Sequence, residues 1–185
     1  MRVAISQSDD YAGVANGAPR AEVSLGTRVR FQTGTDYRIQ WATLIPGDYV
    51  FDSRQPEGIT QIHPGQARGT PPFSITLNND RYAVEIRNGR SQAAEHRDVG
   101  SASADKGRWV RWVLHYVPDG GGSNAVTELF KDGRRVLESR GTPNAYMGDN
   151  GAYFKFGIYK WWWQSRPSDV TQRTLYFGDV QIGER

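Results

Sequence analysis

The chain has 185 residues and no cysteine, so it has the length of one domain over residues 1–185 and offers neither disulfide bonds nor thiolate chemistry. Its formal charge of +3 suits a polyanionic partner. The Lys and Arg residues are scattered and form no basic block, which argues against a nucleic-acid partner. No apolar run approaches the ~20 residues of a membrane span, so no membrane partner is expected either.

The composition and patterning predict an all-β protein. Glycine (21 residues) and aromatic residues (6 Trp, 9 Tyr, 7 Phe) are abundant, and short alternating runs dominate over helical periodicity. In chain order, the expected strands are Arg28–Phe31, Tyr37–Leu44, Phe73–Leu77, Arg81–Arg87, Trp109–Val117, Ala125–Lys131, Arg135–Leu137, Tyr153–Trp161 and Thr174–Ile182. Strands at this spacing, with no helices between them, indicate a β-sandwich or jelly roll.

The connections between these strands carry their own signals. Asn78-Asn79-Asp80 and Asp132-Gly133 are turn sequences, and each lies between two expected strands, so each predicts a hairpin. Residues Gly89–Lys106 are polar and weakly patterned. We expect them to form a long loop, and such loops often rim a binding site.

Side chains alternate across a strand, so the segment from Tyr153 has two distinct faces. The apolar face, which we expect between the sheets, carries Phe154, Phe156, Ile158 and Trp162. The opposite face carries Tyr153, Lys155, Gly157, Tyr159 and Trp161. Two phenols, an ammonium group and an indole suit a sugar acid better than bulk solvent, and the glycine would leave room for a sugar ring to approach the sheet.

The same alternation groups other polar residues. Gln61 and His63 share one face while the residue between them points to the core, and Arg20 and Glu22 share a face in the same way. In the hairpin strand Arg81–Arg87 the apolar positions leave the side chain of Arg87 on the open face, together with those of two other charged residues. Four separate strands thus offer polar or cationic groups to one sheet face.

Three short motifs carry a family resemblance. Arg20-Ala-Glu-Val23, Gln61-Ile-His63 and Tyr153-Phe-Lys-Phe-Gly-Ile-Tyr159 resemble, in order and chemistry, the signature segments of alginate lyases of the β-jelly-roll type. The stretch from Trp109 onward is also similar to heparin-lyase and glucuronan-lyase relatives. Lys160 and Trp161 depart from the alginate pattern, which favours the glucuronan-like relatives. The resemblance covers most of the chain from Arg20 onward.

The resemblance implies a concanavalin-like jelly roll with a concave substrate-binding sheet. It also implies a polysaccharide lyase that cleaves a uronic-acid-containing polysaccharide, such as glucuronan or alginate, by metal-independent β-elimination. Such an enzyme needs a neutraliser for the uronate carboxylate, a base for the adjacent proton and an acid for the leaving oxygen. An acidic polysaccharide is the expected partner and no cofactor is expected. We further expect a monomer that is secreted or periplasmic, although the opening residues lack the apolar stretch of a signal peptide.

The resemblance assigns roles to four residues. It implies that Tyr159 is the acid, that His63 is the base or a charge partner, and that Gln61 and Arg20 clamp the carboxylate. Arg suits this task because its planar guanidinium binds a carboxylate in a bidentate manner, and His because it titrates near neutrality. The residues expected to bind substrate or to support that binding are Lys155, Tyr153, Glu22, Arg87 and Trp161.

Other interpretations of the same residues remain open. The chain can be a non-catalytic carbohydrate-binding jelly roll, although such a module would be expected to lose Gln61, His63 or Tyr159, and all three are present. A glycoside hydrolase on a similar sandwich would need two carboxylates flanking the bond, and no strand shows that pattern. Of the remaining histidines, His96 is expected to be solvated in the loop and His115 to have a structural role.

Overall fold

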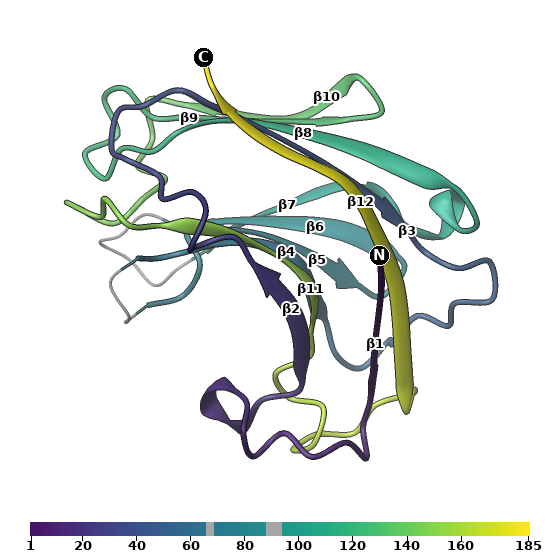
Figure 1. Ribbon diagram of the computed structural model, residues 1–185. Coiled ribbons are helices and arrows are strands. Elements are labelled where there is room, and N and C mark those ends of the chain that lie inside the picture. The colour runs from purple at the N-terminus through teal and green to yellow at the C-terminus, as the bar shows by residue number, and fades with distance from the viewer. Residues whose placement is uncertain (66–68, 88–93) are drawn as a thin grey trace.

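The computed structural model describes residues 1–65, 69–87 and 94–185, and it confirms the predicted all-β sandwich. Two six-stranded antiparallel sheets face each other (Figure 1). The first, sheet A, contains in spatial order β1 (Arg2–Ser6), β12 (Gln172–Glu184), β3 (Tyr37–Leu44), β8 (Trp109–Val117), β9 (Val126–Lys131) and β10 (Arg134–Arg140). The second, sheet B, contains β2 (Arg20–Ser24), β11 (Tyr153–Tyr159), β4 (Glu57–His63), β5 (Phe73–Asn78), β6 (Arg81–Arg87) and β7 (Ala94–Ser101).

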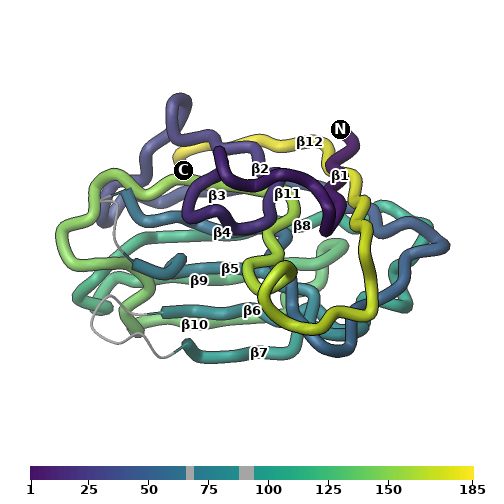
Figure 2. The backbone as a smooth tube through the Cα atoms, turned by 90° about the horizontal axis from the view of Figure 1, so that it is seen from below, coloured from purple at the N-terminus to yellow at the C-terminus, as the bar shows by residue number. Residues whose placement is uncertain are grey.

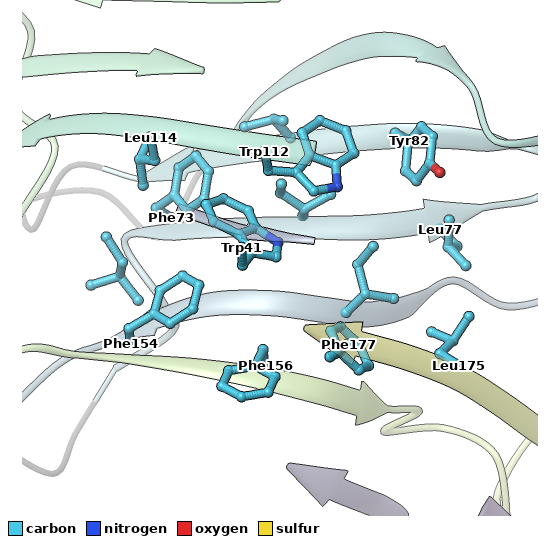
Figure 3. Close-up of a cluster of buried hydrophobic side chains, with 14 of the residues drawn as sticks. Trp41, Phe73, Leu77, Tyr82, Trp112, Leu114, Phe154, Phe156, Leu175 and Phe177 are labelled. Carbon is cyan, nitrogen blue, oxygen red and sulfur yellow. The ribbon is translucent and has the colours of Figure 1, made fainter. Parts of the chain in front are cut away.

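The core lies between the two sheets, whose strands run in similar directions when they are seen from below (Figure 2). Alternate residues of each strand point inward, so β11 contributes Phe154, Phe156 and Ile158, all buried. Large aromatic rings from both sheets interlock (Figure 3). Trp41 stacks on Trp112 with 6.2 Å between ring centroids. The burial of Phe154, Phe156 and Ile158 fixes the register of β11, because a one-residue slip would turn this apolar face to solvent.

The structure differs from the expected elements in four places. The segment Arg28–Phe31 is not a strand, because a turn at Leu25 accepts hydrogen bonds from the N–H groups of Arg28 and Val29, and only Phe31 forms an isolated bridge. The prediction of a loop over Gly89–Lys106 is also wrong for residues 94–101, which form β7 at the edge of sheet B. Residues 89–93 lie outside the described part of the chain.

The other two differences lie near the ends of the chain. Strand β1 was not predicted, and it pairs with β12, itself longer than expected. Strand β11 ends at Tyr159 and is followed by a turn, so Trp161 lies beyond the strand. In consequence Trp162 is exposed rather than in the core, and Trp163 is buried in its place.

The outer face of sheet B is the face that positions the polar residues. Strands β2, β11 and β4 lie side by side at one end of this sheet and bend along their length (Figure 1). Two short 3-10 turns, Ala15–Gly17 and Ser103–Asp105, complete the secondary structure of the described residues. Among those residues, no helix is long and apolar enough to cross a membrane.

Candidate active site

A straight row of polar side chains crosses the outer face of sheet B. The register pairs Lys155 on β11 with Gln61 on β4, and Gln61 with Ser74 on β5. Ser74 in turn pairs with Glu85 on β6, and Glu85 with His96 on β7. Because paired residues point to the same side of a sheet, these five side chains form one continuous polar strip.

A groove of about 640 Å³ follows this face. Its lining comes from both the strands and the turns at their ends, and it includes Arg20, Gly58, Gln61, His63, Ser74, Glu85, Arg87, His96, Tyr159, Trp161 and Trp162. The structure therefore brings together the four residues assigned to catalysis, and Arg87 and Trp161 with them. A groove open along a sheet can take an extended polymer.

Glu22 is the centre of the polar contacts beneath the groove. Its carboxylate accepts hydrogen bonds from Lys155 Nζ at 2.7 Å and from Gln61 Nε2, and it lies 3.5 Å from Arg20 Nη1. The Glu22 side chain is only 5% exposed. Two cations and an amide around one buried carboxylate leave one net positive charge. Glu22 and Lys155 thus support the groove from below, as the alternation of β2 and β11 requires.

Arg20 and Gln61 keep donors that no other described residue accepts from, and these are open to a ligand. Arg20 donates from Nε to the carbonyl oxygen of Ala18 and from Nη1 to Glu22, and a guanidinium has five N–H donors in all. Gln61 uses Nε2 for Glu22, and that amide nitrogen has a second hydrogen. Both side chains line the groove, so the remaining donors can hold a carboxylate there.

Tyr159 lies at one end of the groove, between a cation and an indole. The guanidinium of Arg20 covers its ring at 3.8 Å from the centroid, and the ring of Trp161 is 5.3 Å away. Opposite it on β4 is Gly58, which has no side chain to compete with the Tyr159 and Trp161 side chains for this end of the groove. The phenol is therefore held on two sides while it lines the groove.

His63 lies further along β4, next to Tyr153. Its Nδ1 is 2.8 Å from the carbonyl oxygen of Pro64, so Nδ1 carries the hydrogen and Nε2 of the neutral ring keeps its lone pair. Burial lowers the pKa of His63 below 6.5, with a smaller lowering by the charge of Lys155. The ring stacks on Tyr153 at 5.1 Å, which leaves Tyr153 as a support for the imidazole. His63 is thus a neutral acceptor near pH 7.

The far side of the groove has a second charge cluster. Arg87 Nη2 is 2.6 Å from the Glu85 carboxylate, and His96 Nδ1 is 3.5 Å from it. His96 was expected in a loop but lies on β7, where its side chain is 64% exposed and lines the groove. His115 contacts Glu128 at 2.8 Å on the outer face of sheet A, in keeping with the structural role expected for it.

The glycine at position 157 is required for a different reason from the one that its sequence context suggests. Its φ is +144°, and a Cβ there would lie 2.2 Å from the carbonyl oxygen of Ala21 and 2.7 Å from Glu22 Cα. The glycine therefore permits the close approach of β2 to β11, rather than that of a sugar ring. Because this pairing places Arg20 beside Tyr159, the glycine still serves the groove.

Sequence reasoning missed a buried ion cluster behind the Tyr159 end of the groove. Lys160 is fully buried, and its Nζ lies 2.7 Å from Asp52 and 3.9 Å from Glu57. Arg173 on β12 donates from Nε to Glu57 at 2.7 Å, and Tyr49 also contacts Glu57. The sequence signal for this cluster was Lys160, a charged residue directly after the strand that carries Tyr159. Its partners could not be identified because they are distant in sequence.

The described residues contain no group of three or more His, Cys, Asp or Glu side chains arranged to hold a metal ion. The cationic and amide groups around Glu22 are the electrophilic partners that the groove offers to an anion. The arrangement can bind a carboxylate, accept a proton at His63 and donate one from the Tyr159 phenol.

Comparison with known proteins identifies the family and the fold of the chain. The sequence model of a family described as polysaccharide lyase matches residues 1–181. No curated protein matches the sequence. The fold is similar to that of an endo-β-1,4-glucuronan lyase from the fungus Trichoderma reesei, with a TM-score of 0.78, 18% identity, and coverage of 98% of this chain and 79% of that one.

Two alginate lyases are also similar in fold. An alginate lyase from Pseudomonas aeruginosa has a TM-score of 0.65 and 16% identity, and all of this chain aligns with 82% of it. A family 7 alginate lyase, solved as a variant with bound product, has a TM-score of 0.72 and 13% identity, and all of this chain aligns with 80% of it.

Proposed function

Because this chain belongs to the polysaccharide lyase family, we propose that it cleaves a polyuronate such as glucuronan or alginate by β-elimination in the groove of sheet B. The observation that carries the proposal is the cluster around Glu22, whose carboxylate contacts Arg20, Gln61 and Lys155. Tyr159 and His63 line the groove above this cluster. Its net positive charge suits a uronate carboxylate, and its free donors match the two carboxylate oxygens.

The proposed reaction begins with neutralisation of the carboxylate by Arg20 and Gln61. This withdraws charge from the adjacent carbon and makes its proton easier to remove. His63 Nε2, neutral and unprotonated, accepts that proton on substrates where it faces the histidine. As the electron pair forms the carbon–carbon double bond, the glycosidic oxygen leaves and takes a proton from the Tyr159 phenol. The products are an unsaturated sugar and a new chain end.

The two candidate proton-transfer residues are well separated along the sheet. Tyr159 is opposite Gly58, and His63 is five residues further along β4, about 16 Å of strand at ~3.3 Å per residue, so the two act on one sugar only where both side chains extend toward each other along the groove. On some substrates the proton and the leaving oxygen lie on the same side of the sugar ring. For these we propose that Tyr159 first removes the proton and then protonates the leaving oxygen. Arg20, at 3.8 Å above its ring, would stabilise the phenolate between the two transfers.

Two features support a uronate polymer as substrate. The solved glucuronan lyase and alginate lyases share the fold, and one alginate lyase holds its product in the crystal. Lys160 and Trp161, where this chain departs from the alginate pattern, favour glucuronan as the first substrate to try. We also propose that the protein acts as a monomer outside the cytoplasm, in the periplasm or after secretion, because a polyuronate is too large to diffuse across a membrane.

The test is ultraviolet absorbance of the unsaturated product on a panel of polyuronates, with Tyr159→Phe as the matched variant. The wild type should generate absorbance on at least one polymer. Tyr159→Phe should still bind that polymer, because the hydroxyl is all that is lost, but turnover should fall by about a hundredfold or more. Binding by the wild type without any absorbance change would favour a non-catalytic carbohydrate-binding module instead.

A further inference from the structure

The turn after β11 displays two tryptophans from a rigid base. Trp161 is half-buried and Trp162 is 37% exposed, whereas Lys160 and Trp163 on either side are fully buried. The N–H of Trp163 donates to the carbonyl oxygen of Lys160 at 3.0 Å, and its indole Nε1 donates to the carbonyl oxygen of Val170 at 3.0 Å. Buried side chains at both ends therefore fix the orientation of the two displayed indoles.

The displayed indoles continue the aromatic surface that begins at Tyr159. The rings of Tyr159 and Trp161 are 5.3 Å apart, and those of Trp161 and Trp162 are 5.6 Å apart at 66°. All three line the groove. A soluble protein loses stabilisation by leaving adjoining indoles in contact with water, and such patches commonly mark binding sites. This wall extends the groove past the residue proposed to protonate the leaving oxygen.

Arg166 supplies a positive charge at the outer end of this wall. Its guanidinium lies 3.7 Å from the centroid of the Trp162 ring. Its backbone N–H donates to the carbonyl oxygen of Trp162 at 3.0 Å. Its own carbonyl oxygen accepts a hydrogen bond from the buried Gln55 at 2.8 Å, so the backbone at this position is fixed. No ion pair among the described residues includes Arg166, so its charge is available to an anion there.

We infer that Trp161, Trp162 and Arg166 form an additional uronate-binding subsite on the Tyr159 side of the cleavage point. One sugar ring stacks on the indole surface, and its carboxylate pairs with Arg166. An aromatic face binds the C–H face of a sugar, while a guanidinium binds a carboxylate in a bidentate manner. This inference rests on the proposed function, since it names where a further sugar of the same polymer would bind.

The test is binding of glucuronan and alginate oligosaccharides of increasing length to Tyr159→Phe, which should cleave them far more slowly than the wild type, followed by isothermal calorimetry. In this background, affinity should rise when the chain becomes long enough to reach the subsite. Trp162→Ala should remove that rise, a loss of roughly threefold to tenfold for long chains with little change for short ones. Trp109→Ala is the matched control, because Trp109 is 47% exposed on the outer face of sheet A, far from the groove.

A second variant tests the charge. Arg166→Gln should weaken binding of long oligosaccharides and reduce its dependence on salt, while leaving turnover on the shortest cleavable substrate unchanged. Equal binding of long chains to Tyr159→Phe with and without Trp162→Ala, while the wild type cleaves polyuronates, would overturn the subsite and leave the proposed function standing. An equal loss of affinity for a neutral polysaccharide and for polyuronates in Arg166→Gln would overturn the assignment of the carboxylate. If the wild type cleaves no polyuronate, the proposed function itself fails.

Discussion

Replacement of Lys160 by Met tests how the ion cluster behind the groove contributes to folding. The substitution keeps an unbranched side chain of similar length and removes the ammonium group. Asp52 would then lose a partner 2.7 Å away and Glu57 one at 3.9 Å, in a region where all three side chains are almost completely buried. Asp52 keeps its hydrogen bonds from Ser168 and from two backbone N–H groups, whereas the charge balance of the cluster is lost.

The expected loss follows from the burial of the pair. Removal of one partner of a buried ion pair costs about 3–5 kcal/mol, because it leaves an uncompensated charge. A domain has about 5–15 kcal/mol of stability in total. At this chain length, 1 kcal/mol shifts Tm by about 2–4 °C, so Tm should fall by roughly 6–20 °C. The variant should fold at low temperature and unfold far earlier than the wild type.

The pH dependence of unfolding provides a second measure of the same pair. Burial raises the pKa of Asp52, but hydrogen bonds from Lys160, Ser168 and the backbone outweigh it and lower the pKa from 3.8 to about 2. A lowered carboxyl pKa stabilises the fold above the unfolded value and loses that contribution as pH falls from about 4 to about 2, a change of about 2 kcal/mol. Lys160→Met should show a weaker dependence over this range.

Thermal and denaturant unfolding would measure these losses, with two comparisons. Asp52→Asn in the Lys160→Met background removes the unpaired charge and should recover part of the stability, as a double-mutant cycle would show. Arg54→Met is the control, because the Arg54–Asp169 pair lies nearby with Arg54 59% exposed, and it should cost at most about 1 kcal/mol. If Lys160→Met shifted Tm no more than Arg54→Met, or if Asp52→Asn recovered nothing, the buried pair would not stabilise the fold by more than an exposed one.

Three further outcomes follow from the groove. Because the pKa of His63 is lowered, the imidazole stays neutral at lower pH, so the acid limb of kcat/KM should have its midpoint below 6.5 and should disappear in His63→Ala; a midpoint at or above 6.5 would contradict this. Gln61→Ala should lower turnover by about a hundredfold while Tm changes little, since the side chain contacts Glu22 and the groove but not the core, and near-normal turnover would show that the carboxylate binds elsewhere. Treatment with a chelator should leave the activity unchanged, whereas loss restored by a divalent ion would contradict the assignment of carboxylate neutralisation to Arg20 and Gln61.

The local parts of the fold could be predicted from the sequence. Turn sequences at Asn78-Asn79-Asp80 and Asp132-Gly133 marked two hairpins that the structure contains, and alternation along β11 separated the core residues from those of the groove. These signals are short in range, since they depend on backbone geometry and on the period of a strand.

Long-range features could not be predicted in the same way. The cluster of Asp52, Glu57, Lys160 and Arg173 joins residues more than a hundred positions apart, and charged residues are expected at the surface unless paired. β7 has no apolar alternation because it is an edge strand in which only Val99 is buried. Glu22 was expected to orient Arg20 or another cation, and its carboxylate does contact Arg20 and Lys155; the third contact, with Gln61 on β4, depends on strand pairing that the sequence does not show.

Strand β11 places two kinds of constraint on neighbouring residues. Phe154, Phe156 and Ile158 are committed to the interior, while Tyr153, Lys155 and Tyr159 support or line the groove. Substitutions at even-numbered positions should therefore lower the yield of soluble protein, and those at odd-numbered positions should spare yield but lower catalysis. Gly157 is the exception, because its backbone conformation makes it sensitive in both respects. A single inserted residue would exchange the two sets, so this segment should tolerate neither insertions nor deletions during evolution, however freely its surface neighbours diverge.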